Sequence, residues 1–342
     1  MSDHIHFLVG TYTDGASQGI ERIALDVSTG ELAHIRTQLR ATNPSFLCKH
    51  PCSEEQTLYT ASELSQQEGA QLYSVNSKGE HRIAVQGDYP CHLSCDPQGQ
   101  YLALANYGSG NANVYLLNNE GIAQQCVADL FVAGCGANAE RQERPHAHQV
   151  TFLTQSDHLA VVDLGSDRIY FYQFDRKSHS FTLLQSIVMP AGSGPRHLVF
   201  NSTETHAYVV CELSEMLVTL QCQEQKWVIA HEVPLLPNTE NGEAASAIKM
   251  SRDERFIYVS CRAQNKVVCF ELQQHLPVLI DDVDCGGQFP RDFALSDDEQ
   301  WLVVANQHSN NLTSYHRNSS TGQLEATGYH CEVGSPVCVV PS

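Results

Sequence analysis

Short apolar segments alternate with polar turns along the whole chain, in a pattern that predicts β-strands. The stretch "YPCHLSCDPQGQYLALANYGSGNANVYLL" (89–117) holds an apolar strand, a turn rich in Asp, Pro and Gly, a second apolar strand, a polar turn and a third strand. Four stretches that start at 146, 194, 244 and 289 follow the same plan, and a looser copy starts at 43. Apolar spacing of about 3.6 residues, typical of helices, is almost absent. We therefore expect an all-β protein built from repeats.

The distance between the copies identifies the kind of repeat. Equivalent residues in the six copies stand 46, 57, 48, 50 and 45 positions apart. Units of this length with several strands each are typical of a β-propeller, in which four-stranded blades surround a central channel. The outer fourth strands are expected beside turn signals such as "STGEL" (28–32), "NEG" (119–121) and "STGQL" (320–324).

The two ends of the sequence together predict one more blade. The N-terminal "HFLVGTYTDGASQGIERIALD" matches a unit from its second strand onward, whereas the C-terminal "GSPVCVVPS" matches only a first strand. A blade closed by both ends removes the sheet edges that an open array would expose. We therefore expect a seven-bladed β-propeller with four-stranded blades, in which residues 1–342 form a single domain.

Charge and composition narrow the range of partners. The 342 residues include 39 acidic and 20 basic side chains, and the resulting net charge of −19 would repel nucleic acid. The N-terminus lacks a signal-peptide pattern, and no run of about eighteen apolar residues occurs, so we expect a cytoplasmic protein without a membrane partner. Thirteen cysteines without a CxxC pair indicate neither a disulfide framework nor a zinc site.

Alignment of the repeats gathers the reactive side chains into two columns. The first column, just before each first strand, is Ser45, Cys91, His148, Arg196, Ser246, Arg291 and Val337. The second column, just after each second strand, is Glu63, Tyr107, Leu164, Glu212, Arg262, Gln307 and Tyr12. In a propeller both columns face one mouth of the channel, where arginines would hold a carboxylate or phosphate. Glu212 or His148 could act there as a general base. A ring of ion pairs that joins neighbouring blades is the structural alternative.

Other motifs in the sequence give weaker signals. His146 and His148 in "RPHAH" stand two apart and could chelate a metal from a strand, but no third ligand lies near them in sequence. The sequence therefore predicts neither a metal nor a cofactor. The charged segment "ERQERPHAH" (140–148) is either a loop over the channel mouth or a solvated insertion. Three polar residues at strand ends are expected to cap turns, namely Asn106, Asp163 and Asp167.

Several of these segments carry a family resemblance. "RPHAHQV", "GSGPRHLVFN", "VSCRAQN" and "FPRDFALSDD" resemble the lactonase-type seven-bladed propeller family, which includes the propeller form of 6-phosphogluconolactonase and the fungal carboxymuconate lactonising enzyme. The likeness covers nearly the whole chain. It implies a site of four residues, His148, Arg196, Arg262 and Glu212, and Arg291 matches a recurring "PR" of the phosphogluconolactonase-like members. Substrate contacts are also expected from Tyr107, Tyr12, Gln307, His146 and Glu63.

The resemblance implies a metal-independent lactone hydrolase, most directly a 6-phosphogluconolactonase of the pentose phosphate pathway, acting on a small anionic sugar lactone or carboxylate. Glu212 or His148 would activate water, and Arg196 would stabilise the carbonyl oxygen. Arg262 and Arg291 would hold a phosphate or carboxylate. Two alternatives stay open: cyclisation of a carboxylated muconate, and a channel that binds a ligand or protein without turnover. For the oligomeric state we expect a monomer or a weak homo-oligomer.

Overall fold

The computed structural model describes residues 4–52 and 56–342, and within these ranges the chain forms 28 β-strands and no helix. The strands pair into seven sheets of four strands each. The predicted all-β class and the predicted number of strands in each blade are therefore confirmed. The part of the chain that the structure describes has no helix that could cross a membrane.

The chain divides into two compact units. The first unit comprises Met1–Ser45, Tyr208–Thr219 and Ala230–Ser342. It contains three sheets, which in spatial order are β28 (Pro336–Pro341), β1 (His4–Thr11), β2 (Gly19–Asp26) and β3 (Leu32–Arg40); β20 (Ala245–Met250), β21 (Phe256–Cys261), β22 (Lys266–Gln273) and β23 (Leu276–Asp284); and β24 (Pro290–Leu295), β25 (Trp301–Asn306), β26 (Asn311–Arg317) and β27 (Leu324–Glu332).

The second unit comprises Phe46–Ala207 and Leu220–Ile229. Apart from the first residues of β4, it contains β4 (Pro44–Lys49), β5 (Leu58–Ser62), β6 (Gln71–Asn76) and β7 (Gly79–Ala84); β8 (Pro90–Cys95), β9 (Tyr101–Asn106), β10 (Asn111–Leu117) and β11 (Ala123–Phe131); and β12 (Ala147–Phe152), β13 (His158–Asp163), β14 (Arg168–Asp175) and β15 (Ser180–Val188). The remaining sheet has residues in both units and consists of β16 (Pro195–Phe200), β17 (His206–Cys211), β18 (Met216–Gln223) and β19 (Lys226–Pro234). This division leaves the single domain a prediction.

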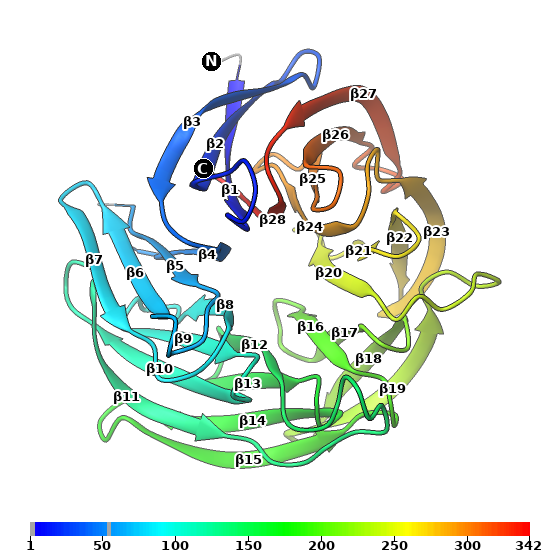
Figure 1. Cartoon of the computed structure of the whole chain (residues 1–342). Helices are drawn as coiled ribbons and strands as arrows, with labels where there is room; N and C mark the ends of the chain where they lie inside the picture. The colour runs from blue at the N-terminus through cyan, green and yellow to red at the C-terminus, as the bar shows by residue number, and fades with distance from the viewer. Residues whose placement is uncertain (1–3, 53–55) are drawn as a thin grey trace. The chain divides into compact units, whose positions relative to one another are not determined.

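One sheet of the first unit joins the two ends of the chain, as the sequence predicts. β28 pairs antiparallel with β1, with Val339 opposite Val9 and Val340 opposite Leu8. In Figure 1 the red strand β28 accordingly lies beside the blue strand β1. The C-terminal segment thus supplies the first strand of this sheet, and the N-terminal segment supplies the other three.

Burial follows the position of each strand within its sheet. Second strands such as β9 ("YLALAN") and β25 ("WLVVAN") are buried along their whole length, which explains why they read as continuous apolar runs. Fourth strands such as β3 and β7 are mostly exposed. The cores lie between the faces of neighbouring sheets, where burial of each large apolar side chain stabilises the fold by about 1.5–3 kcal/mol.

The three predicted turn signals all connect third strands to fourth strands. Each contains a glycine in the left-handed region, namely Gly30, Gly121 and Gly322, with φ between 74° and 79°. A Cβ atom at Gly322 would lie 2.2 Å from the ring of Phe256 on the neighbouring sheet. The missing side chain lets the turn approach β21 closely, and Tyr258 Oη donates a hydrogen bond to the Gly322 carbonyl at 2.7 Å.

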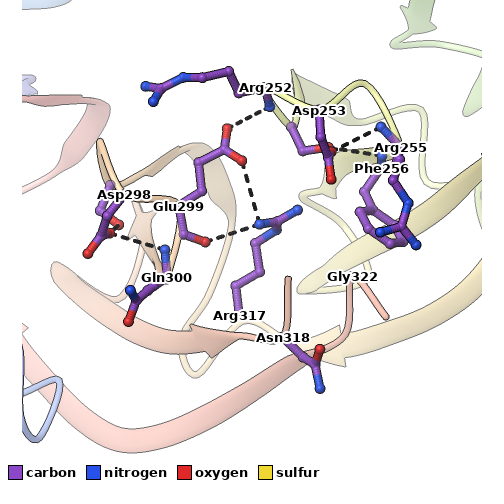
Figure 2. A network of polar contacts seen from close by, with 12 residues as sticks. Arg252, Asp253, Arg255, Phe256, Asp298, Glu299, Gln300, Arg317, Asn318 and Gly322 are labelled. Carbon is purple, nitrogen blue, oxygen red and sulfur yellow. Dashed lines mark hydrogen bonds and ion pairs between the residues drawn. The ribbon is translucent and has the colours of Figure 1, made fainter. Parts of the chain in front are cut away.

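A buried arginine joins the same two sheets of the first unit (Figure 2). Arg317, at the end of β26, donates through Nε to Tyr258 Oη at 2.7 Å and through Nη1 to the Glu299 carbonyl at 3.2 Å. The Glu299 carboxylate lies 3.6 Å from Arg317 Nη1 and accepts a hydrogen bond from the Arg252 backbone N–H at 2.7 Å. Arg317 therefore links the β20–β23 sheet to the β24–β27 sheet.

Candidate active site

Within a sheet, the strand register brings the two columns to the same end. Pro290 of β24 pairs with Asn306 of β25, so Arg291 and Gln307 follow paired residues. Pro90 of β8 likewise pairs with Asn106 of β9, which precedes Tyr107. The expectation that the two columns share one end of each blade is met in these sheets.

A β-bulge occurs at first-column residues, which the sequence does not reveal. In β8, β12 and β24 the register shifts by one residue at Cys91, His148 and Arg291 respectively. The same irregularity occurs at Val337, between the pairs that Pro336 and Cys338 form with β1. A bulge leaves its extra residue outside the ladder and re-aims the side chain. The local backbone therefore turns these side chains away from the regular sheet positions.

A second recurring feature is a polar turn residue whose side chain binds the linker that leads into a first strand. Four polar residues, each three positions after a second-column residue, have a left-handed backbone with φ between 52° and 56°: Asp167, Glu215, Asn265 and Asn310. Their side chains accept hydrogen bonds from backbone N–H groups of the following linker, at residues 192 and 194, 242 and 244, 289, and 335 respectively. Each turn thus holds the segment that ends at the next first-column residue.

Of these four residues, Asp167 has the side chain that accepts the most hydrogen bonds. Its buried carboxylate accepts from Gly192 N at 2.6 Å, from Gly194 N at 2.7 Å and from Gln142 Nε2 at 2.7 Å. Gly194 stands two residues before Arg196. The sequence predicts Asp167 only as a turn cap, whereas the structure also assigns it the linker that leads to an arginine of the candidate site.

The other two predicted caps differ from each other. Asp163 accepts from His146 N at 2.5 Å and from Gly165 N at 3.3 Å, as a turn cap does. Burial raises the pKa of the Asp163 carboxyl, although these hydrogen bonds and one from Ser166 act in the opposite direction. Asn106 instead donates through Nδ2 to Asn113 Oδ1 at 2.8 Å, across to the third strand.

In the second unit, His148 lies among aromatic and sulfur neighbours. It is buried on β12, with the ring of Tyr107 5.4 Å away in an edge-on arrangement. The Cys91 thiol lies 3.9 Å from His148 Nδ1 and donates to the His148 carbonyl at 3.5 Å. The structure therefore brings His148 and Tyr107 together.

His146 is also buried but is engaged differently. Its ring stacks on Tyr107 with centroids 4.4 Å apart, and its Nδ1 lies 2.9 Å from the Tyr107 carbonyl. Its Nε2 lies 3.2 Å from the Glu143 carboxylate. Both of these partners of the His146 ring are hydrogen-bond acceptors. His146 thus joins the charged segment 140–148 to the end of β9.

Arg196 is the second residue of β16 and is only 3% exposed. Its terminal nitrogen Nη1 lies 3.2 Å from Nδ1 and 3.4 Å from Nε2 of His197. The sequence gives no reason to single out His197, which sits among apolar residues in "PRHLVF". The His197 ring nevertheless contacts the guanidinium of Arg196.

In the first unit, Glu212 and Arg262 form a buried ion pair. Arg262 Nη2 lies 3.0 Å from Glu212 Oε2, and the two side chains are 7% and 3% exposed. Arg262 also donates through Nε to the Ala244 carbonyl at 2.9 Å and through Nη2 to the Ala245 carbonyl at 3.3 Å. Its guanidinium lies over the ring of Phe289, 5.0 Å from the centroid. The ion pair that the sequence offers as a structural alternative is therefore formed between these two predicted site residues.

The predicted site also includes Arg291, Tyr12, Gln307 and Glu63. The guanidinium of Arg291 lies over the ring of Tyr12, 5.3 Å from its centroid. Ser246 donates to the Arg291 carbonyl at 2.6 Å, which ties one first-column residue to the next. Gln307 follows β25, and its buried Oε1 has no hydrogen-bond partner among the residues that the structure describes. Glu63 follows β5 in the second unit and is partly buried.

The thirteen cysteines are present as thiols and form no disulfide with one another. Within residues 4–52 and 56–342, no group of three or more His, Cys, Asp or Glu side chains is arranged to hold a metal ion. The predicted site residues include buried guanidinium groups, carboxylates, imidazoles and phenols.

Comparison with known proteins assigns this arrangement to a family. The family described as "Lactonase, 7-bladed beta-propeller" matches residues 6–341. The chain belongs to this family of lactonases, and the predicted seven-bladed propeller and the family resemblance are confirmed. A 6-phosphogluconolactonase of Bacillus subtilis is 32% identical over 97% of this chain and 96% of its own length.

Two solved structures share the fold. A Lactobacillus plantarum protein has a TM-score of 0.90 and 30% identity, covering 99% of both chains. A periplasmic gluconolactonase of Pseudomonas aeruginosa has a TM-score of 0.88 and 27% identity, again with 99% of both chains covered. The names of these relatives include both a phosphorylated and an unphosphorylated lactone substrate.

Proposed function

We propose that this chain hydrolyses a small anionic sugar lactone, and specifically that it is a 6-phosphogluconolactonase. Membership of the lactonase family and the activity named for the Bacillus subtilis relative support the reaction. The observation that carries the proposal is the burial of Arg196 and Arg262, at 3% and 7% exposure, in a chain of net charge −19. Buried guanidinium groups are common where a protein must hold a carboxylate or a phosphate.

The chemical step requires a base and a stabilised oxyanion. As the base takes a proton from water, the water oxygen bonds to the carbonyl carbon; the ring C–O bond then breaks, and its oxygen receives a proton. We assign the base to His148, because the Glu212 carboxylate is held 3.0 Å from a guanidinium that weakens its basicity. Arg196 stabilises the oxyanion in this assignment.

The other two arginines, Arg262 and Arg291, then have different roles in binding the substrate. The edge of Arg262 formed by Nε and Nη2 already binds two carbonyls and Glu212, so Glu212 acts by orienting Arg262. Arg291 is the better candidate for the phosphate, because its guanidinium is held over Tyr12. The buried Oε1 of Gln307 suits a sugar hydroxyl donor. The repeat alignment of the two columns is the argument for joint action on one substrate.

The first experiment compares two lactones. Purified protein is mixed with 6-phosphogluconolactone or with unphosphorylated gluconolactone, with and without EDTA, and the disappearance of each is measured above its spontaneous hydrolysis. We expect acceleration of the phosphorylated lactone, unchanged by EDTA. Equal acceleration of both lactones would overturn the specific substrate but leave lactonase activity, and acceleration of neither would overturn the proposal.

Substitutions then test the assignment of the base. His148→Asn is expected to lower kcat by about 10²–10⁴-fold and to remove the acid limb that the base contributes to the pH profile. Glu212→Gln should lower kcat less and keep that limb. The reverse pattern would transfer the role of base from His148 to Glu212.

A further inference from the structure

Gln142 lies in the charged segment 140–148 but is completely buried. Its Nε2 donates to the Leu164 carbonyl at 2.8 Å and to the Asp167 carboxylate at 2.7 Å. Its Oε1 accepts from the Asn138 backbone N–H at 3.0 Å. A primary amide has two N–H donors and one carbonyl oxygen, so every polar group of this side chain has a partner. Gln142 therefore ties its own loop to the turn between β13 and β14.

The same turn holds the residues that lead to His148. The His146 N–H donates to the Asp163 carboxylate at 2.5 Å, and the Leu164 N–H donates to the His146 carbonyl at 3.0 Å. His146 stands two residues before His148, whose bulge interrupts the pairing of β12 with β13. The segment that carries the proposed base is thus fixed to this turn by its backbone and by Gln142.

The turn also holds the linker that leads to Arg196. Asp167 Oδ2 accepts from Gly192 N, and its Oδ1 accepts from Gly194 N, two residues before Arg196. The Gln142 donor binds the same oxygen, Oδ1, that binds Gly194 N. Loss of the Gln142 contact should therefore free the carboxylate that holds the linker.

We propose that Gln142 is a positioning residue, which keeps the segment before His148 and the linker before Arg196 attached to one turn. This role deepens the proposed lactonase function and rests on it. The base and the oxyanion donor must act on one carbonyl group at the same time, and a displacement of about 1 Å can cost about 10²-fold in rate. All of these contacts lie within the second unit.

The first unit offers a matched control. Gln264 donates through Nε2 to the Glu215 carboxylate at 2.8 Å, and Glu215 accepts from Gly242 N at 3.1 Å and from Ala244 N at 3.2 Å. The Ala244 carbonyl in turn accepts from Arg262 Nε. Gln264 therefore supports a residue that we assign to substrate binding, whereas Gln142 supports the two residues that we assign to the chemical step.

Two variants remove the amide donors and nearly keep the length of the side chain, Gln142→Met and Gln264→Met. Hydrogen exchange followed by mass spectrometry compares them with the wild type in the absence of substrate. Gln142→Met should speed exchange in residues 136–142 and 192–194 and leave residues 242–244 unchanged, and Gln264→Met should do the reverse. Unchanged protection of residues 192–194 in Gln142→Met would overturn the proposal.

A third variant, Gln142→Glu, covers the case in which Gln142→Met does not fold. A protonated carboxyl can donate to the Asp167 carboxylate, whereas two ionised carboxylates that face each other repel. Protection of residues 192–194, measured relative to the wild type at each pH, should therefore fall as the pH rises from about 5 to about 9. A relative protection that does not change with pH would count against the role of Gln142.

Lactone hydrolysis supplies the functional measurement. Gln142→Met should lower kcat by about 10–100-fold with little change in KM, while Gln264→Met should mainly raise KM. The same balance of kcat and KM effects in both variants would contradict the positioning role. If the wild type hydrolyses no lactone, the proposed function fails instead, and the exchange of residues 192–194 still decides whether Gln142 holds the linker.

Discussion

Arg262 and Glu212 form an ion pair, with Nη2 and Oε2 3.0 Å apart and both side chains buried. The two residues come from equivalent positions of successive blades, directly after β21 and β17. This contact thus joins two sheets of the fold, and it also holds the guanidinium of Arg262, a residue of the candidate site.

The pair predicts strong coupling between its two members. Glu212→Ala leaves a buried guanidinium without its carboxylate, and we expect a loss of about 3–5 kcal/mol in the free energy of unfolding. Removing both partners, as in the double variant Glu212→Ala with Arg262→Met, should cost less than the sum of the single changes. Urea denaturation of the four proteins measures this coupling; additive losses would show that the contact contributes nothing.

The linker contacts of Asp167 predict a local effect near Arg196. Asp167→Ala removes the acceptor for Gly192 N and Gly194 N, so the amides of residues 192–194 should exchange with solvent faster. Hydrogen exchange followed by mass spectrometry measures this change. Asn265→Ala, which alters the corresponding contact of another linker, should leave the 192–194 amides unchanged. Equal protection in Asp167→Ala and the wild type would contradict the role of Asp167.

Two arginines of the network in Figure 2 differ in burial and should differ in their effect on stability. Arg317→Met removes a buried guanidinium that binds Tyr258 and Glu299, and we expect a loss of about 2–4 kcal/mol. Arg255 is exposed and donates to the Ser320 carbonyl, so Arg255→Met should cost less than about 1 kcal/mol. Similar urea midpoints for the two variants would exclude Arg317 as a major link between these sheets.

Glu21 predicts a pH dependence of stability. Burial acts to raise the pKa of the Glu21 carboxyl, but hydrogen bonds from His34, Ser17 and Thr37 outweigh it and hold that pKa below its usual value. A depressed folded-state pKa adds stability above the unfolded-state pKa, and this stability is lost as pH falls through the folded value. The wild type should therefore lose more stability between about pH 5 and pH 3 than Glu21→Gln. Urea midpoints at both pH values test this, with the exposed Glu31→Gln as control; equal losses in wild type and Glu21→Gln would refute it.

Repetition explains why so much of the fold could be predicted from sequence. The buried second strands read as apolar runs in every unit, and the two ends match complementary parts of one blade, as the β28–β1 pairing confirms. The two columns could be recognised in the sequence because the spacing between Arg196 and Glu212 is repeated between the equivalent residues of other units. Contacts between side chains that are distant in sequence could be predicted less well.

The missed features have specific physical causes. A bulge such as the one at His148 adds a residue without disturbing the apolar pattern, so the sequence does not mark it. Asp167 looks like any turn residue until its linker partners 25 and 27 positions later are known. His197 was not recognised because an aromatic residue in a first strand usually indicates core packing. The Glu212–Arg262 contact could be stated only as one of two possibilities, since column membership does not fix which charges meet.

The pairing of β28 with β1 also sets an order of events during protein synthesis. Among the described strands β1 is translated first, but β28, which completes its sheet, is translated after the other 27. Throughout that interval the inner edge of β1, with Val9 and Leu8, remains open to any other extended segment. In a nascent chain this edge of β1 is therefore exposed from the synthesis of β1 until β28 has been translated and can pair with it.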